Sequence, residues 1–182
     1  MSKVLIFPTD TVYGIGTPID DLEGIKRIYS IKNRPLDKPL ACLCDSLEQI
    51  QSIAIVDSNA LKLIEKLLPG PLTIILKAKP EIKQLIGYDT IGVRIPKHRG
   101  ALTILHNEGP MLTTSVNDSG NVPLNEYDEI CEKYSHLVDH IYNTVTKSSN
   151  ISSTVVYAVD GKLEILREGE ITIDRISEAL NV

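Results

Sequence analysis

Residues 90–96 read TIGVRIP, and their alternation of apolar side chains indicates a β-strand in a layered fold. One side of this strand would be apolar throughout, formed by Ile91, Val93 and Ile95. The other side would carry Thr90, Gly92 and Arg94. Because an arginine in such a strand needs a counter-anion, Arg94 predicts either a carboxylate of the protein or an anionic ligand beside it.

The segments on both sides of this strand alternate between strand and helix patterns. Strands are expected at 3–7, 40–44, 72–78, 110–117, 153–159 and 162–167, the last two joined by the hairpin signal Asp160-Gly161. Residues 9–16 form a turn-rich segment, and a helix begins at Asp20, which with Glu23 resembles a capping box. Further helices are expected at 46–53, 57–68, 98–107, 125–134 and 173–180. The pattern predicts an α/β fold, with one domain over residues 1–182, a twisted, open, mixed sheet and flanking helices.

Composition sets the class of protein. The 182 residues include no Trp and one Phe, so the core must consist mainly of Ile, Leu and Val, which suits stacked α/β layers. A net charge of −5 argues against a general nucleic-acid or anionic-membrane surface but permits a local basic pocket. Apolar runs fall far short of the ~20 residues that span a bilayer, and the first residues lack a signal-like cleavage region. We therefore expect a cytoplasmic protein.

The three cysteines, Cys42, Cys44 and Cys131, form no disulfide framework. Cys42 and Cys44 would face the same side of a strand, and no second ligand pair lies at usable spacing for a metal. Buried, reduced thiols are the favoured interpretation.

A basic loop, KNRPLDKPL, spans residues 32–40 and follows the first helix. Its cations are Lys32, Arg34 and Lys38. Pro35 and Pro39 restrict the backbone of Arg34 and Lys38, which would lower the entropy lost on binding a polyanion. Arginine offers a planar fork for phosphate oxygens and lysine a point charge. A solvated basic loop at a helix C-terminus explains the same residues, so the loop alone does not decide between these readings.

A second polar group follows in MLTTSVNDSG, where Thr113, Ser115 and Asn117 are spaced by two. On an extended chain they would place two hydroxyls and an amide on one face, which a core strand would rarely do. A solvent-facing strand that runs into a turn explains them as well. Arg167, at the end of a strand, raises the same question as Arg94 more weakly.

The common nucleotide and catalytic signatures are absent from the sequence. There is no GxxxxGK[ST] loop, and GIG at residues 14–16 is too short for a dinucleotide fingerprint. The four histidines form no HExxH motif and pair with no Cys or Ser in a catalytic order. General acid–base machinery is therefore not visible.

Seven ordered segments together resemble the YrdC-like family: FPTDTVYGIG, KNRPLDKPL, LLPGPLTIILK, TIGVRIP, TTSVNDSG, SSTVV and LREG. The resemblance covers essentially the whole chain, and it is to the short, single-domain branch. It implies a twisted, open α/β sheet with a large basic cavity on one side. It also implies a nucleotidyltransferase activity, threonylcarbamoyl-AMP synthesis, in which L-threonine, bicarbonate or CO2, and ATP give threonylcarbamoyl-adenylate and pyrophosphate. This product feeds the threonylcarbamoyladenosine modification of tRNA.

The resemblance also implies roles for particular residues. Lys32 and Arg34, the KxR pair, would be catalytic. The ATP site would comprise Lys32, Arg34, Lys38, Thr90, Ser115, Asn117 and Arg167. The threonine site would comprise Thr11, Tyr13, Arg94, Thr113 and Ser153. Mg2+ is expected with ATP, although no carboxylate is assigned to it. A downstream tRNA threonylcarbamoyl transferase complex is an expected partner, and direct binding of tRNA is left open.

Three departures from the family pattern affect these expectations. Leu43 stands where many members carry a His that contributes to the threonine site, and Ser152 stands where Glu is common. The chain ends soon after LREG, so we expect it to lack the C-terminal domain of the longer branch.

Two alternatives to the synthase remain. A double-stranded RNA-binding module is disfavoured by the net charge of −5, because duplex affinity comes largely from many phosphate contacts. A paralogue with the same fold but different chemistry is disfavoured by the intact KxR and SxN motifs.

Overall fold

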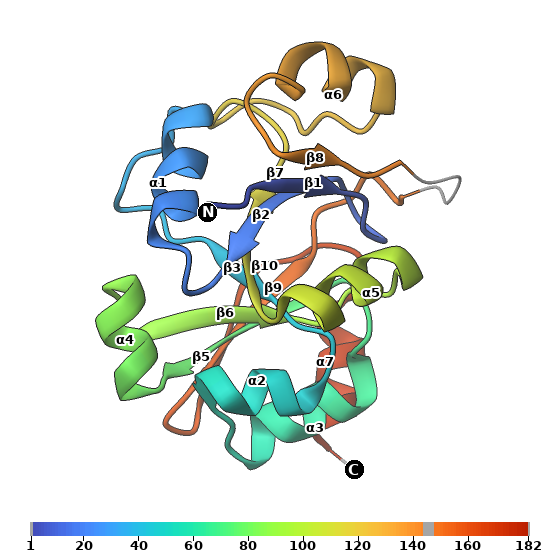
Figure 1. Cartoon of the computed structure of the whole chain (residues 1–182). Helices are drawn as coiled ribbons and strands as arrows, with labels where there is room; N and C mark the ends of the chain where they lie inside the picture. The colour runs from blue at the N-terminus through green and yellow to red at the C-terminus, as the bar shows by residue number, and fades with distance from the viewer. Residues whose placement is uncertain (1, 144–147, 182) are drawn as a thin grey trace.

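The described residues, 2–143 and 148–181, form a ten-stranded mixed sheet in this computed structural model (Figure 1). The strand order is β10-β9-β5-β6-β3-β7-β2-β1-β8, and β4 pairs with β5 outside this path. The bounds are β1 Leu5–Phe7, β2 Gly14–Pro18, β3 Ala41–Leu43, β4 Ala54–Ile55, β5 Leu72–Ala78, β6 Thr90–Arg94, β7 Met111–Ser115, β8 His140–Ile141, β9 Thr154–Val159 and β10 Lys162–Arg167. The pairs β1–β8, β3–β6 and β5–β9 are parallel, and the others are antiparallel. The prediction of an α/β fold with a mixed, open sheet is confirmed.

One face of this sheet is the main hydrophobic core. The register places Cys42 between Val93 and Leu112, and it places Ile74 between Val93 and Val156. All five side chains are at most 3% exposed. Since alternate residues of a strand point to opposite faces, this register sends their neighbours to the other side of the sheet.

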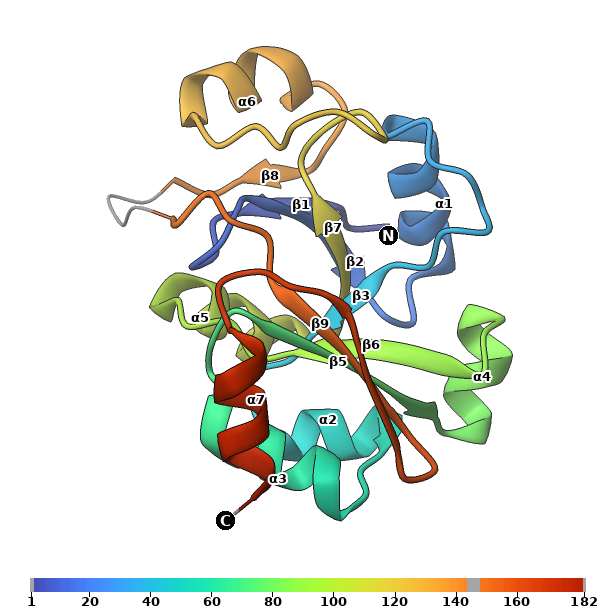
Figure 2. The same cartoon turned by 180° about the vertical axis from the view of Figure 1, so that it is seen from behind.

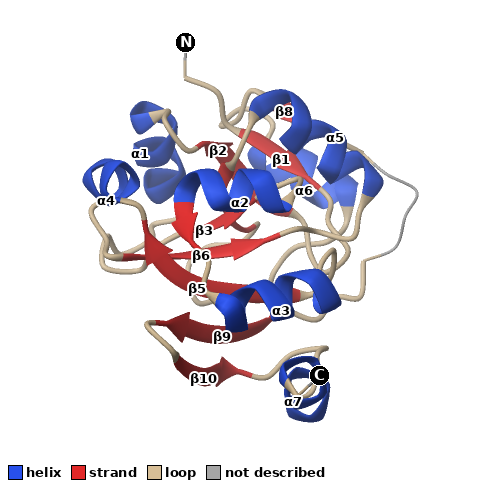
Figure 3. Cartoon of the chain, turned by 90° about the horizontal axis from the view of Figure 1, so that it is seen from below, coloured by secondary structure: helices blue, strands red, loops and turns tan. Residues whose placement is uncertain are grey.

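Helices pack on both faces of the sheet. Their bounds are α1 Leu22–Ile31, α2 Leu47–Ile53, α3 Ser58–Leu67, α4 Pro80–Ile86, α5 Arg99–Glu108, α6 Tyr127–Tyr134 and α7 Ile173–Leu180. The helices other than α5 add apolar side chains to this core, whereas α5 belongs to a second apolar cluster with Leu43 and Met111 on the other face. Ile50 of α2 and Leu63 of α3 belong to the same apolar cluster as Ile74 and Val93. Figure 3 shows α2 and α3 lying across the strands, and Figure 2 shows α7 packed beside α3. Away from α5, the polar face of the central strands therefore remains available for a site.

The alternation expected for residues 90–96 is confirmed. Ile91, Val93 and Ile95 are buried at 2%, 0% and 5% exposure, while Thr90 and Gly92 face a cavity on the other side. The hairpin at Asp160 and Gly161 is also confirmed, and both residues have positive φ, 51° and 79°. Paired positive φ values are those of the tight turn that suits the twist of a hairpin.

Four elements were not anticipated from the sequence: β2, β4, β8 and α4. β2 begins at Gly14, inside the segment expected to be turn-rich, because it pairs with β1 on one side and β7 on the other. Its glycines are required by close packing, since a Cβ at Gly14 or Gly16 would lie 2.7 Å from the Thr113 side chain. A long-range partner of this kind leaves no local signal in the sequence.

The expected capping box at the start of α1 is wrong by one residue. Asp21, not Asp20, is the N-cap, and its Oδ1 accepts a hydrogen bond from the backbone N–H of Gly24 at 2.8 Å. α1 then ends at Ile31, and Asn33 has a φ of 48°. The helix therefore ends through a left-handed residue before Pro35 is reached, and not through the prolines themselves.

The cysteine prediction holds for two of the three thiols. Cys42 and Cys44 are both fully buried, and burial raises the pKa of the Cys42 thiol well above its ordinary value. Cys131 is only partly buried. Among the described residues, no group of three or more His, Cys, Asp or Glu side chains could hold a metal ion.

Candidate active site

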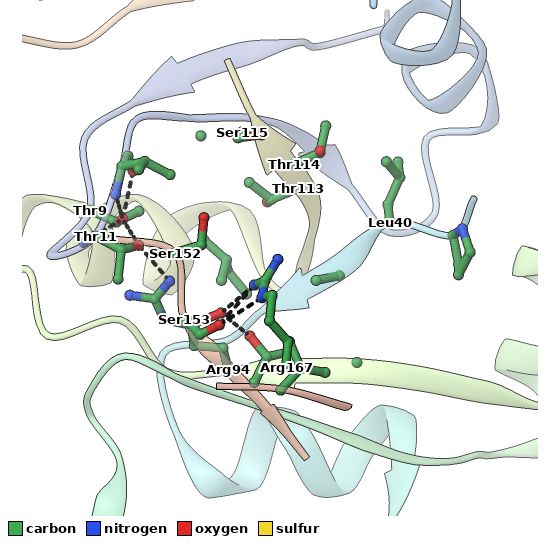
Figure 4. Close-up of a pocket in the computed structure, with 18 of the residues that line it drawn as sticks. Thr9, Thr11, Leu40, Arg94, Thr113, Thr114, Ser115, Ser152, Ser153 and Arg167 are labelled. Atoms are coloured by element: carbon green, nitrogen blue, oxygen red, sulfur yellow. Dashed lines mark hydrogen bonds between the residues drawn. The ribbon is translucent and has the colours of Figure 1, made fainter. Parts of the chain in front are cut away.

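A cavity of about 380 Å³ lies on the polar face of the central strands (Figure 4). Residues 113–115 of β7 line one side, and Arg94 and Arg167 lie opposite them. Thr11 is at one end and Leu40 at the other. The sheet register explains this gathering, because Ser115 pairs with Gly14, Thr113 with Ala41, Leu43 with Arg94 and Ile75 with Gly92. Directly opposite residues of neighbouring strands share a face, so segments far apart in sequence meet here.

Most of the residues predicted to form a site line this cavity. Those that do are Thr11, Tyr13, Arg34, Thr90, Arg94, Thr113, Ser115, Ser153 and Arg167. Lys32, Lys38 and Asn117 do not belong to its lining. Sequence reasoning missed Thr9, Thr73 and Thr114, which also line it.

Arg94 is the most deeply buried cation of the cavity, at 6% exposure. Its Nε donates to the Gly70 carbonyl at 3.0 Å, one terminal nitrogen to Thr11 Oγ1 at 2.8 Å, and the other to Asp10 Oδ1 at 2.6 Å. Burial lowers the pKa of Arg94, and the Asp10 carboxylate opposes that effect. The counter-anion required by the sequence is therefore a carboxylate of the protein.

Asp10 is the important site residue that sequence reasoning did not single out. Its Oδ1 also accepts a hydrogen bond from the Lys97 backbone N–H at 3.0 Å, and its side chain is 16% exposed. Asp10 does not line the cavity and so lies behind Arg94. It belongs to the FPTDTVYGIG motif, but an ion pair that spans 84 residues has no local pattern by which to find it.

The basic loop after α1 is braced by its own arginine. Arg34 Nε donates to the Lys38 carbonyl and a terminal nitrogen donates to the Pro39 carbonyl, both at 2.9 Å. Tyr29 and Tyr88 donate their hydroxyls to the carbonyls of Lys38 and Leu36. Arg34 reaches the cavity, whereas Lys38 is exposed. The loop is thus ordered by hydrogen bonds as well as by its prolines.

Lys32 has a different environment from the other two cations of the loop. Its side chain is 1% exposed, and its Nζ donates to the carbonyls of Ser115 and Asn117 and to Asn117 Oδ1, the last at 3.0 Å. Burial lowers the pKa of Lys32 to about 8, and Arg34 contributes to the same shift. Lys32 therefore ties the end of α1 to the end of β7 and does not project into the cavity.

Asn117 is similarly committed to internal bonds. Its Oδ1 accepts from Ser115 Oγ at 2.6 Å, and its Nδ2 donates to the carbonyls of Asp118 and Asn121. Of the SxN pair, only Ser115 lines the cavity. The two motifs that sequence reasoning treated as separate, KxR and SxN, form one hydrogen-bonded unit.

The opposite wall is organised by Arg167 and Ser153. Arg167 donates from Nε and a terminal nitrogen to the Ser153 carbonyl, at 3.1 and 2.8 Å, and burial lowers the pKa of Arg167. The Ser153 hydroxyl shares a hydrogen bond with Thr73 Oγ1 at 2.8 Å. Arg167, at the end of β10, is thereby held against Ser153, the residue before β9, and both lie at the cavity, as Figure 4 shows.

Tyr13 and Thr113 both line the cavity, and groups outside the lining also act on them. Burial raises the pKa of Tyr13, and the groups that raise it further, Tyr127, Cys131 and Glu126, belong to α6 or its cap. Tyr13 therefore lies within electrostatic reach of α6 as well as at the cavity. Thr113 Oγ1 donates to the Met111 carbonyl at 3.1 Å, and its methyl group packs over Gly14.

The charged residues in the described lining of the cavity are all positively charged. Three arginines, Arg34, Arg94 and Arg167, contribute to its lining together with nine Ser and Thr residues. Among the described lining residues there is no carboxylate and no histidine, and Leu43 and Ser152 both belong to the wall. Such a site can bind polyanions and orient them through hydroxyl groups, but it offers no general base.

These features define a class, an open mixed α/β sheet with an arginine- and hydroxyl-lined cavity on its polar face. A family model described as Telomere recombination, Sua5_yciO_yrdC, matches residues 1–169. The chain belongs to this Sua5/YciO/YrdC family.

Related sequences cover nearly the whole chain. A protein of Methanocaldococcus jannaschii is 36% identical over 177 residues, which cover 96% of this chain and 84% of that protein. A Pyrococcus abyssi protein named threonylcarbamoyl-AMP synthase is 31% identical over 98% of this chain. The chain spans 54% of the length of that relative.

Solved structures of related proteins superpose on nearly the whole chain. Pyrococcus abyssi Sua5 complexed with L-threonine superposes with a TM-score of 0.91 at 30% identity, over 98% of this chain and 54% of that one. Escherichia coli YciO superposes with a TM-score of 0.86 at 28% identity, over 96% of this chain and 87% of that one. Among the described residues, no helix is long and apolar enough to cross a membrane.

Proposed function

We propose that this protein is a threonylcarbamoyl-AMP synthase, a nucleotidyltransferase that makes threonylcarbamoyl-adenylate and pyrophosphate from L-threonine, bicarbonate or CO2, and ATP. The observation that carries this proposal is the single cavity that gathers Arg34, Arg94, Arg167 and Ser115, which come from four separate sequence motifs. The naming of relatives as threonylcarbamoyl-AMP synthases supports the same conclusion.

In this proposal the threonine carboxylate would meet Arg94, whose guanidinium is held in place by Asp10 and Thr11. Thr113 and Ser153 would complete the amino-acid pocket, and Tyr13 would form part of its wall. Arg94 already has three partners, so threonine would share this guanidinium with Asp10 and would not replace it.

ATP would extend from this pocket toward the loop after α1. Arg34 and Lys38 would hold its phosphates, with Thr90, Ser115 and Arg167 beside them. Lys32 and Asn117 are bonded to each other behind the cavity. They would reach ATP only by exchanging these bonds for bonds to phosphate, and otherwise they position Ser115.

The chemistry requires little acid–base catalysis from the protein. The threonine nitrogen bonds to the carbon of CO2 and loses protons to water, which gives a carbamate. A carbamate oxygen then attacks the α-phosphorus of ATP, and the bond to the pyrophosphate oxygen breaks. Fixed arginines can position the reactants and stabilise the charge that develops on the phosphates.

Mg2+ would accompany ATP through the phosphate oxygens. Among the described residues, no carboxylate lines the cavity to hold the ion. We further propose a cytoplasmic location and transfer of the product to a tRNA-modifying transferase complex.

The test is pyrophosphate release from ATP and Mg2+, with threonine and bicarbonate each added or omitted, and mass spectrometry of a rapidly quenched sample. The proposal predicts release that needs both co-substrates and a threonylcarbamoyl-adenylate mass. Folded protein that binds ATP but releases no pyrophosphate would contradict it and would favour a paralogue with other chemistry.

A further inference from the structure

The cavity carries an unbalanced positive charge. Arg94 is paired with Asp10, but Arg34 and Arg167 donate only to backbone carbonyls and to the Ser153 hydroxyl. Neither belongs to an ion pair among the described residues. Both guanidiniums therefore act on any charged group that enters a space of about 380 Å³.

No carboxylate of the described residues lines this space, so the lining offers no negative charge to an ammonium group. Two carboxylates act on the Arg94 guanidinium from outside the lining: Asp10, its ion-pair partner, and Glu170, which is exposed. Lys32 and Asp118 lie behind β7, where Asp118 is paired with Lys133 at 2.8 Å. The lining itself offers hydroxyls, carbonyls and apolar side chains, and no described residue of it carries a negative charge.

This arrangement conflicts with the usual state of free threonine, whose α-amine is protonated near pH 7. Like charges disfavour the protonated form of a bound amine. Pairing of the substrate carboxylate with Arg94 also weakens the internal attraction that keeps the ammonium charged. Both effects act on the same nitrogen, which must be unprotonated before it can react with CO2.

We propose that the cavity binds L-threonine with its amine unprotonated and thereby prepares the nucleophile that captures CO2. The inference rests on the proposed function and adds the form of the substrate that the site selects. On binding, the ammonium loses one proton to solvent and keeps the nitrogen electron pair. That pair then forms the N–C bond to CO2, one C=O π pair moves to oxygen, and a second proton leaves as the carbamate forms.

ATP is a polyanion and would offset the charge of Arg34 and Arg167. The proton must therefore leave while the phosphate sites are empty. The cavity thus supplies, through fixed positive charge, the deprotonation for which its lining contains no general base.

Isothermal titration of L-threonine into the purified protein tests this directly. The titrations use CO2-free buffers of different ionisation enthalpy, without ATP, at several pH values. We expect release of about one proton per threonine bound near pH 7, and a Kd that falls about tenfold per pH unit between pH 6.5 and 8. No proton release and a Kd that does not change with pH would overturn the inference.

A matched ligand separates the substrate amine from groups of the protein. 2,3-Dihydroxybutyrate replaces the amine by a hydroxyl and should bind without proton release. If both ligands release equal numbers of protons, the proton comes from a protein group such as Lys32, and the inference fails. Pyrophosphate release that depends on threonine, without proton release on binding, would overturn this inference but not the synthase. Absence of both pyrophosphate release and threonine binding would overturn this inference and the proposed synthase activity together.

A second set of titrations uses variants that remove one positive charge each. Arg34→Gln and Arg167→Gln should each reduce the number of protons released and flatten the pH dependence of Kd. The control Arg175→Gln removes an exposed arginine of α7 that pairs with Glu178, and it should leave both quantities unchanged. Equal effects of all three variants would contradict a local field in the cavity.

Discussion

At the residue scale, Arg34 has two tasks that one substitution removes together. It reaches the cavity, and it braces its own loop through the carbonyls of Lys38 and Pro39. A hydrogen bond to a charged group is worth about 1.5–3 kcal/mol, so Arg34→Ala should reduce kcat/KM for ATP by about 10- to 150-fold. Steady-state kinetics check this, with Arg34→Lys as the variant that keeps the charge but loses the fork. Unchanged ATP kinetics in a folded Arg34→Ala protein would rule out the phosphate role.

Asp10 permits a second test at this scale, because it touches Arg94 and does not line the cavity. Asp10→Asn keeps an oxygen for Arg94 but removes the charge that orients it. We expect KM for threonine to rise about tenfold or more while KM for ATP stays within about twofold. Asp10→Ala should be worse and also less stable, since it leaves a buried guanidinium without its counter-ion.

The control for Asp10 is Asp139→Asn, which weakens a more exposed ion pair, to Arg27 at 2.9 Å, on another part of the molecule. Parallel changes of both KM values in Asp10→Asn would indicate a general structural effect and would contradict a positioning role toward threonine.

At the element scale, α1 and β7 are joined by the Lys32 ammonium, and this contact should make stability depend on pH. The folded-state pKa of Lys32 is lowered to about 8 from its ordinary 10.5, chiefly by burial. Between these values the unfolded chain binds more protons than the folded one, so the contribution of Lys32 to stability rises with pH. Below pH 8 it is constant.

The comparison is urea unfolding of the wild type and Lys32→Met at pH 7, 8.5 and 9.5. The variant leaves the Ser115 and Asn117 carbonyls without their donor, which should cost about 1–3 kcal/mol at pH 7. The difference in unfolding free energy should grow in favour of the wild type above pH 8. A difference that is constant across the series would show that the Lys32 pKa is the same in both states.

Some of the strands and helices could be predicted from the sequence, and others could not. Strands such as β5 and β6 and helices such as α3 and α7 follow directly from periodicity, because each buries one face. β2 was missed because its glycines depend on close contact with Thr113 from a distant strand. The cap of α1 was displaced because Asp20 and Asp21 carry the same local signal.

The site was predictable as a set of residue types and not as a set of contacts. The strand pattern predicted a counter-anion beside Arg94, yet the partner that the structure shows, Asp10, is 84 residues away in the sequence. Lys32 and Asn117 were grouped with ligand-facing residues, although their bonds to each other at 3.0 Å keep them behind the cavity wall. Which polar groups satisfy one another depends on strand register, and register is decided by long-range pairing.

At the scale of the whole molecule, positive charge is concentrated in a cavity of an otherwise acidic protein. The net charge is −5, while the cavity lining is cationic. Duplex RNA offers phosphates spread along its length, and high affinity requires many simultaneous contacts on an open surface. Three arginines gathered at one cavity suit a nucleoside triphosphate better than a duplex.

This distribution of charge predicts weak, non-specific binding of double-stranded RNA. Fluorescence anisotropy with a 20-base-pair duplex at 50 and 150 mM salt should give a Kd no tighter than the range of about 10⁻⁴–10⁻⁶ M at the higher salt. ATP should not compete strongly with whatever binding remains, because the two ligands would use different surfaces. Nanomolar affinity with a steep salt dependence that persists in Arg34→Ala would instead identify an RNA-binding surface outside the cavity. Loss of that affinity in Arg34→Ala would place RNA at the cavity itself and contradict the assignment of this loop to ATP alone.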